Sequence, residues 1–81
     1  MTVTVLYFGI VRERLGMAEE TVECAEGTTV EGLTATLADL HPGLADGVES
    51  VRIAVNRDYV DSSRVLSDND EVAVIPPVSG G

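Results

Sequence analysis

The sequence predicts an α+β roll, in which one main helix packs across one face of a mixed sheet of four to five strands. Three observations support this prediction. Residues 2–8 and 71–75 are rich in β-branched and apolar side chains, which is typical of strands. A single apolar stripe at helical spacing runs through residues 30–40, and such a stripe needs a sheet to cover it. Shorter apolar runs at 20–24 and 51–55 supply the remaining strands.

The elements of the first part follow from local patterns. Residues 2–8 are apolar on both faces near their end, which favours a central position in the sheet. Residues 11–16 predict one or two helical turns that end at a glycine. Polar and apolar residues alternate at 20–24, so we expect a half-buried strand whose inner side carries Val22 and Cys24.

The main helix has the clearest local signals. Thr28 and Glu31 match a capping box, in which each side chain satisfies the other's backbone donor at the start of a helix. Pro42 ends the helix, because a proline forces the residue before it out of helical geometry. The apolar stripe between these points is formed by Val30, Leu33, Leu37 and Leu40.

The second half of the chain predicts short elements joined by turns. The first and last strands are the most apolar, so we expect them to lie side by side at the centre of the sheet. Residues 1–75 form one domain in this interpretation, and residues 76–81 form an extended, flexible tail. The expected elements are a loop at 44–50, a strand at 51–55, a turn at 56–58, a short return strand at 59–60, a solvated turn at 68–70 and a final strand at 71–75.

The charge balance excludes several classes of partner. The chain carries 14 acidic and 5 basic residues, a net charge of −9, and all the basic residues are arginines. Nucleic acids and anionic membranes would repel it, so neither is an expected partner. No apolar run approaches the ~20 residues of a membrane-spanning helix, and no signal segment opens the chain. With a single cysteine, a cytoplasmic protein that its core alone stabilises is the simplest interpretation.

No pattern predicts an autonomous active site. His41 is more simply explained as a histidine that the macrodipole favours at the end of a helix than as a catalytic base. Cys24 is expected to pack as a small hydrophobic residue rather than to react. One histidine and one cysteine cannot build a structural zinc site, and the acidic turn at 68–70 lacks the spacing of a calcium loop. We therefore expect no metal and no stably bound cofactor.

The C-terminal tail is the exception. Pro76 and Pro77 stop the last strand and extend the chain away from it. Gly80 and Gly81 have no side chains, so this backbone can enter a narrow channel, and the carboxylate of Gly81 is the least hindered in the molecule. Such a tail could be activated as an acyl adenylate by the ATP site of another protein. The alternative is an ordinary frayed terminus.

Three stretches of the sequence match a known family: residues 6–13, residues 54–56 with Val60, and residues 66–81, which end in Pro-Pro-Val-Ser-Gly-Gly. The chain resembles ubiquitin-like β-grasp proteins with a C-terminal Gly-Gly tail, and more narrowly the small, sulfur-carrying subunits of molybdopterin synthase. The thiazole-pathway carrier is similar in fold but is usually shorter and lacks the two prolines.

The resemblance implies a mechanism. An adenylyltransferase of the ubiquitin-activating type would use ATP to adenylate Gly81, and a sulfur donor of the cysteine desulfurase or rhodanese type would convert it to a thiocarboxylate. The tail, which Gly80 allows to thread, would enter the large synthase subunit and give its sulfur to cyclic pyranopterin monophosphate. The large subunit would supply the catalytic side chains, so this chain would be a non-catalytic, sulfur-donating subunit of the synthase.

The resemblance also implies an apolar contact surface on the sheet. Its candidates are Phe8, Leu66, Val74 and Ile75, together with the tail residues Pro76, Pro77, Val78 and Ser79. The alternative for the apolar candidates is ordinary core packing. The charge of −9 would steer the carrier toward basic surfaces on its partners, or it would simply favour solubility.

Other functions share the same features. The chain could be a ubiquitin-like modifier that is conjugated through Gly81 to lysines of other proteins. It could be a sulfur carrier for thiamine, tRNA thiolation or cysteine. It could also be an interaction domain with a chance Gly-Gly end.

Overall fold

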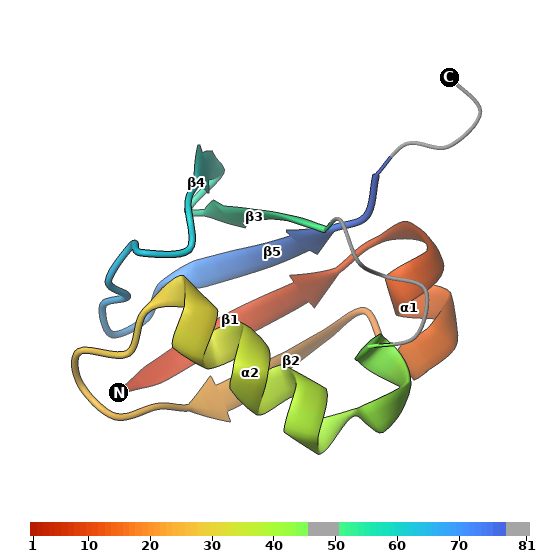
Figure 1. Ribbon diagram of the computed structural model, residues 1–81, viewed down its shortest axis with the longest axis horizontal. Coiled ribbons are helices and arrows are strands. Elements are labelled where there is room, and N and C mark those ends of the chain that lie inside the picture. The colour runs from red at the N-terminus through yellow and green to blue at the C-terminus, as the bar shows by residue number, and fades with distance from the viewer. Residues whose placement is uncertain (46–50, 78–81) are drawn as a thin grey trace.

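A computed structural model describes residues 1–45 and 51–77 (Figure 1). The chain alternates strands and helices before it returns to strands, as the sequence predicts. The elements are β1 (Thr2–Tyr7), α1 (Gly9–Leu15), β2 (Glu19–Glu23), α2 (Val30–Leu40), the 3₁₀ helix η1 (Pro42–Ala45), β3 (Arg52–Val55), β4 (Asp58–Val60) and β5 (Glu71–Ile75).

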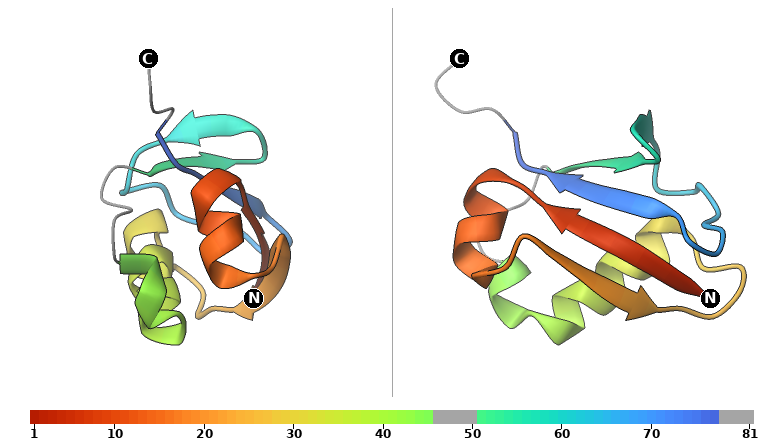
Figure 2. Two further views of the ribbon diagram at one scale, coloured as in Figure 1. Left: turned by 90° about the vertical axis from the view of Figure 1, so that its right-hand side faces the viewer. Right: turned by 180° about the vertical axis from the view of Figure 1, so that it is seen from behind.

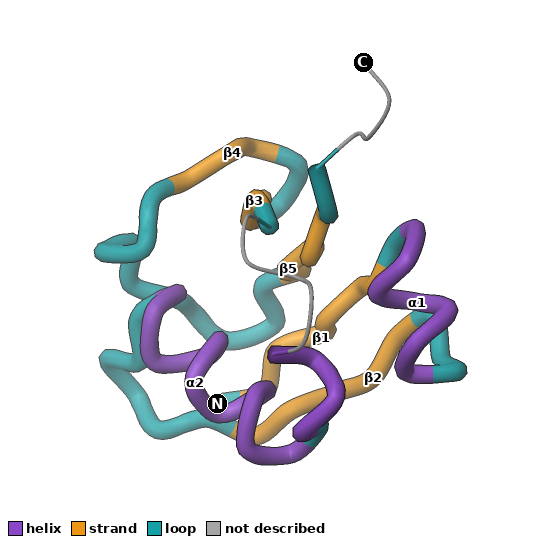
Figure 3. Tube along the Cα trace, turned by 45° about the vertical axis from the view of Figure 1, so that its right-hand side comes forward, coloured by secondary structure: helices purple, strands orange, loops and turns teal. Residues whose placement is uncertain are grey.

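The strands form one mixed sheet in the order β2-β1-β5-β3-β4. The first and last strands, β1 and β5, lie side by side and parallel at its centre, which confirms the prediction. All other neighbouring strands are antiparallel. Figure 3 shows β5 between β3 and β1. Helix α2 lies against one face of the sheet, and α1 lies at the end where β1 finishes (Figure 2). This architecture is the ubiquitin-like β-grasp.

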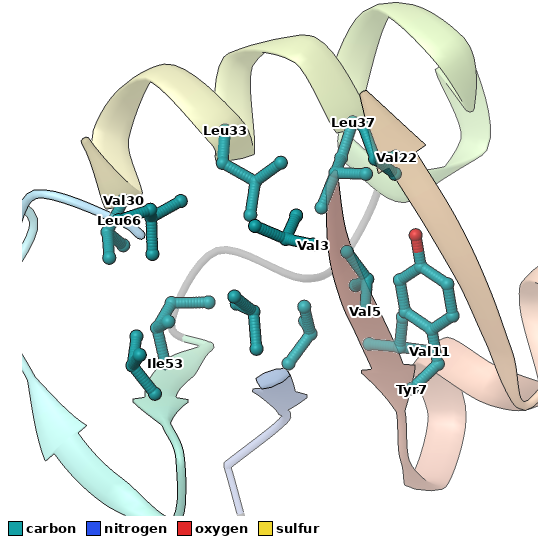
Figure 4. Close-up of a cluster of buried hydrophobic side chains, with 13 residues drawn as sticks. Val3, Val5, Tyr7, Val11, Val22, Val30, Leu33, Leu37, Ile53 and Leu66 are labelled. Atoms are coloured by element: carbon teal, nitrogen blue, oxygen red, sulfur yellow. The ribbon is translucent and has the colours of Figure 1, made fainter. Parts of the chain in front are cut away.

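The core lies between α2 and the inner face of the sheet (Figure 4). Leu33 and Leu37 of α2 are fully buried there, opposite the inward residues of β1. Leu40, the fourth member of the predicted apolar stripe, is 55% exposed, so the prediction is wrong at this position. It is the last residue of α2, and next to it the polar pair of His41 and Glu20, rather than an apolar contact, joins the helix to β2. The buried cluster comprises Val3, Val5, Tyr7, Val11, Val22, Val30, Leu33, Leu37, Ile53, Val55, Leu66, Val72 and Val74.

Helix α1 ends where the sequence predicts. Gly16 takes a left-handed conformation with a φ of 70°, and its amide donates to the Arg12 carbonyl at 2.9 Å. A glycine adopts this conformation at the least cost. The helix starts two residues earlier than expected, at Gly9.

The predicted capping box of α2 is wrong by one residue. Thr28 does not cap the helix, because Thr29 takes that position and its side chain accepts from the Gly32 amide at 3.2 Å. The amide of Glu31, which the predicted box would have satisfied, donates instead to the Ser62 carbonyl at 3.0 Å. A tertiary contact with the 62–66 segment therefore displaces the local motif.

The turn at 68–70 is more than a solvated connection, which corrects the sequence-based interpretation. Asp70 is only 8% exposed. Its Oδ1 accepts from Asn56 Nδ2 at 2.9 Å, and its Oδ2 accepts from the Ser67 amide at 2.7 Å. Asn56 Oδ1 in turn accepts from the Glu71 amide at 3.0 Å. Buried polar groups need such partners, so Asp70 joins the turn after β3 to the start of β5.

Candidate functional site

The tail begins at the centre of the sheet. Strand β5 is held on both sides, by β1 and by β3, and ends at Ile75. Pro76 is half-buried and Pro77 is exposed, and neither has an amide to continue the ladder. The remaining tail candidates, Val78, Ser79, Gly80 and Gly81, lie outside the described residues. The root of the tail therefore has a defined position on the body of the protein.

Gly9 contacts this root directly. Its φ is 56°, and a Cβ added to it would lie 2.9 Å from Pro76 Cγ. Both facts favour glycine, because any other residue would be strained in the left-handed conformation and its Cβ would clash with the proline ring. The local sequence pattern does not single out Gly9. The contact between residues 9 and 76 depends on the parallel pairing of β1 with β5, which no local pattern reveals.

The face of the sheet opposite α2 carries the exposed apolar candidates. The register places Tyr59, Ala54, Ala73 and Leu6 in one row across four strands. The two alanines form a low floor, and larger side chains surround it. The result is a hollow of about 400 Å³, lined by Leu6, Phe8, Ala54, Arg57, Tyr59, Glu71, Ala73 and Ile75. We call this surface the open face.

Two of the four apolar candidates from the sequence lie on the open face. Phe8 is 42% exposed, and Ile75 is half-buried beside it. Leu66 and Val74 are only 3% exposed, so the expectation that they lie on the surface is wrong. Val74 points inward because it alternates with Ile75 along β5. Leu66 lies next to Val30 beneath the start of α2 (Figure 4), and its amide donates to the Thr28 carbonyl at 2.9 Å.

Sequence reasoning missed the alanine floor and its aromatic and basic rim. The signal was present in the alternation of 52–55 and 71–75, where the outward positions hold Ala54 and Ala73. A small residue on the outward side of a central strand leaves room above the sheet. Tyr59 could be found as an exposed aromatic residue on a short strand, and it is 63% exposed.

Charge is divided across the open face. The Arg52 guanidinium lies 5.7 Å from the centre of the Tyr59 ring, a cation–π distance. Arg57 lines the hollow from the β3–β4 turn. On the opposite side lies Glu19 of the edge strand β2, which is in register with Leu6 of β1. The face is therefore basic toward β4 and acidic toward β2, although the whole chain is strongly acidic.

His41 and Cys24 have structural surroundings. His41 Nε2 lies 2.6 Å from Glu20 Oε2, which also accepts from the Tyr7 hydroxyl at 2.5 Å. Burial, and then the hydrogen bond to Glu20, raise the pKa of the Tyr7 phenol well above its usual range. Burial raises the pKa of the Cys24 thiol as well, which disfavours the reactive thiolate. Within 1–45 and 51–77, no group of three potential metal ligands comes together, and no helix is long and apolar enough to cross a membrane.

The fold and this site define a ubiquitin-like β-grasp protein in which the root of the C-terminal tail, Pro76 and Pro77, follows the central strand β5 beside an open apolar face. The family model described as the ThiS family matches residues 5–81, and the chain belongs to that family. Among curated relatives, it is 46% identical to the molybdopterin synthase sulfur carrier subunit of Mycobacterium tuberculosis, over 98% of this chain and 96% of the relative. It is 41% identical to the subunit of the same name from Chlamydomonas reinhardtii, over the whole of both chains.

Solved structures agree with this membership. A putative subunit 1 of the molybdopterin converting factor from Pyrococcus furiosus is 35% identical, with a TM-score of 0.86 over 96% of this chain and 99% of that one. Small archaeal modifier protein 1 from Methanosarcina acetivorans is 28% identical, with a TM-score of 0.78 over 99% and 96%. A chain from the complex of subunits 1 and 2 of the molybdopterin-converting factor of Helicobacter pylori is 26% identical, with a TM-score of 0.74 over the whole of both chains.

Proposed function

We propose that this chain is the sulfur carrier subunit of a molybdopterin synthase and that the carboxylate of Gly81 carries the sulfur. The observation that carries the proposal is the family match, which extends from residue 5 through the tail to Gly81. Relatives that match over nearly their whole length have this role in their names. The central position of β5 supports the proposal, because a reacting group is best presented from a rigid element.

The chemistry starts from an unreactive carboxylate. A carboxylate oxygen of Gly81 attacks the α-phosphorus of ATP on an adenylyltransferase of the ubiquitin-activating type, and pyrophosphate leaves. A persulfide sulfur of a cysteine desulfurase or rhodanese-type donor then attacks the acyl carbon, and AMP leaves. A thiol reduces the resulting acyl disulfide and releases the thiocarboxylate. ATP is bound by the activating enzyme in this scheme, and the whole cycle takes place in the cytoplasm.

The loaded tail then enters the large synthase subunit. The thiocarboxylate sulfur displaces an oxygen substituent from a carbon of cyclic pyranopterin monophosphate and so forms the new carbon–sulfur bond. Water then cleaves the acyl carbon–sulfur bond to restore the carboxylate of Gly81. Two such transfers complete one dithiolene. Gly80 and Gly81 suit a narrow channel because they have no side chains. The acid and base groups come from the large subunit.

The open face is the proposed contact with that subunit. Phe8 and Ile75 lie on it next to the root of the tail. A protein bound to this face would therefore be adjacent to the point where the tail leaves the sheet. Exposed apolar surface of this kind is typical of protein interaction sites. The Helicobacter pylori relative was solved as a complex of subunits 1 and 2, which supports a two-protein assembly.

Intact mass spectrometry of the protein from its own host tests the proposal. A fraction of the chains is expected to be heavier by the exchange of one oxygen for one sulfur atom at Gly81. If Gly81 is found only in isopeptide bonds to lysines of other proteins, the protein is a modifier, as the similarity to a small archaeal modifier protein allows. That result would overturn the carrier proposal.

Deletion of Gly81 provides a second test. The truncated chain is expected to lose dithiolene formation with the large subunit while its thermal unfolding is unchanged, because β5 ends at Ile75. Continued dithiolene formation by the truncated chain would contradict the proposed role of this carboxylate.

A further inference from the structure

Phe8 and Arg57 line the hollow of the open face, and each occupies a position where local structure favours another residue type. Asn56 and Arg57 form the two-residue turn between β3 and β4, and both have positive φ values, 50° and 73°. Such turns favour Asn followed by Gly, so Asn56 fits and Arg57 does not. Phe8 is the N-cap residue of α1, yet its side chain makes no cap hydrogen bond. Serine, threonine, aspartate or asparagine would stabilise the helix there.

The side chains of Phe8 and Arg57 line the same hollow. Arg57 and Phe8 are distant in sequence, and both line the hollow above Ala54 and Ala73. Residues that break local preferences persist where their side chains have another use. The use that Arg57 and Phe8 share is the wall of this hollow.

The hollow has room for a large apolar side chain. Its floor is formed by the methyl groups of Ala54 and Ala73, and its volume is about 400 Å³. Its walls include Leu6, Phe8 and Ile75, so most of the surface that such a side chain would contact is apolar. Interface hot spots are typically large side chains that fill a pocket of this kind.

The rim of the hollow adds a charge preference. Among the residues that the structure describes, no carboxylate lies within ion-pair distance of Arg57. An unpaired guanidinium at the edge of an apolar surface favours a carboxylate on whatever covers it, because the bidentate pair gains strength when water is excluded. Glu19, which is in register with Leu6 on the β2 side, lies across the sheet from Arg57, so the charges also set the direction in which a partner docks.

We propose that the hollow is a socket for one large apolar side chain of the partner protein, and that Arg57 binds a carboxylate which the partner presents beside that side chain. The proposal rests on the proposed function, since the partner is the large subunit that receives the tail. It adds which feature of the open face recognises that subunit and what chemistry the subunit must present. The expected attraction between an acidic carrier and basic surfaces then applies to the β2 side of the face alone.

The socket is tested by filling it. Ala73→Leu extends a side chain from the floor into the hollow and is expected to weaken binding of the large subunit by about tenfold or more, measured by calorimetry with the full chain. The matched control is Ala35→Leu, which makes the same change at an exposed position of α2, on the other side of the sheet (Figure 2). The control is expected to bind as the wild type does. Binding of Ala73→Leu with unchanged affinity would overturn the socket.

The role of Arg57 is tested by a variant that the fold should prefer. Arg57→Gly places glycine at the left-handed position of the turn, so its thermal midpoint is expected to rise, while its affinity for the large subunit falls by about tenfold. Arg64→Gln removes the same charge from an exposed position outside the hollow and should leave affinity unchanged at moderate salt. Equal affinity of Arg57→Gly and the wild type would overturn the carboxylate contact.

The outcomes separate the two proposals. If the wild-type chain does not bind a large synthase subunit at all, the proposed function fails, and the socket fails with it. If the wild type binds and both Ala73→Leu and Arg57→Gly bind equally well, the proposed function stands and the socket alone is wrong.

Discussion

The two faces of the sheet are formed by the same strands but differ in the size and burial of their side chains. The inner face carries Val3, Val5, Val72 and Val74, which α2 covers completely. The open face has alanines at its centre and large, half-exposed side chains at its edge. Packing requirements explain the inner face position by position. On the open face, local conformational preference does not explain Phe8 at the N-cap of α1 or Arg57 at a positive φ.

This comparison predicts that substitutions on the two faces change different quantities. Substitutions on the inner face should change the free energy of unfolding and leave partner affinity unchanged in the folded protein. Substitutions on the open face should change partner affinity and leave the free energy of unfolding nearly unchanged. The following variants test that separation in order of their expected effect on stability.

The largest loss of stability is expected inside the core. Leu37 is 1% exposed, so Leu37→Ala leaves a cavity between α2 and the sheet and should reduce the unfolding free energy by about 3 kcal/mol. Urea denaturation measures the change. Affinity for the large subunit should match that of the wild type below the unfolding transition, and a loss of affinity there would show that the two faces are coupled.

The network around Asp70 should come next. Asp70→Ala leaves the Asn56 amide and the Ser67 amide without their acceptor, which is expected to cost about 2 kcal/mol in urea denaturation. Asp39→Ala at the exposed end of α2 removes the same charge without a buried partner and should be nearly neutral. Equal effects of the two variants would mean that the network contributes nothing beyond its charge.

A substitution at Gly9 is expected to affect both the stability of the fold and the position of the tail root. Gly9→Ala and Gly16→Ala both put a side chain at a positive φ, which costs about 1 kcal/mol. Only Gly9→Ala also meets Pro76, while nothing lies within 4 Å of a Cβ at Gly16. Gly9→Ala should therefore destabilise more and should slow sulfur transfer, whereas Gly16→Ala should transfer normally. Identical transfer rates would show that the contact with Pro76 does not orient the tail.

Tyr7 gives the inner face a pH dependence. Its pKa is raised above the ordinary value of 10.0 by burial and by the hydrogen bond to Glu20, so the folded state holds the proton more tightly than the unfolded state does. The stability from this group is complete below pH 10.0 and is lost as the pH rises beyond it. Tyr7→Phe should cost about 1 kcal/mol at neutral pH and should show a smaller decline in alkaline urea denaturation. An unchanged alkaline slope would contradict this assignment.

Phe8 should show the smallest effect on stability and a clear effect on binding. Phe8→Ser removes a wall of the hollow and supplies an N-cap to α1, so the unfolding free energy should change by less than about 0.5 kcal/mol. Titration with the large subunit should reveal the weaker complex. A Phe8→Ser variant that binds normally would remove Phe8 from the interface.

Much of the fold could be predicted from local patterns. The alternation in strands, the stripe of α2 and the glycine at the end of α1 each depend on neighbours a few residues away. The errors occurred where distant segments meet. Ser62 accepts the bond that displaced the cap of α2, and the polar contact of His41 with Glu20 replaces the one expected from Leu40.

The candidate site was predictable only in part for the same reason. The tail motif is continuous in sequence, so Pro76 and Pro77 could be identified directly. The open face collects residues from four strands and a turn, and a pattern that treats each strand alone cannot tell which apolar residue faces outward. Leu66 and Val74 were misassigned in this way, while Ala54 and Ala73 were overlooked because small residues give no hydrophobic signal.

The central position of β5 has a consequence for the biosynthesis of the protein. Among the described strands, β5 leaves the ribosome after the others, and it pairs with both β1 and β3, which are not neighbours in the sheet. The pairs β1–β2 and β3–β4 can form before β5 emerges, but a chain interrupted before residue 71 lacks the strand that joins them. The order of synthesis therefore delays completion of the sheet until β5 has emerged.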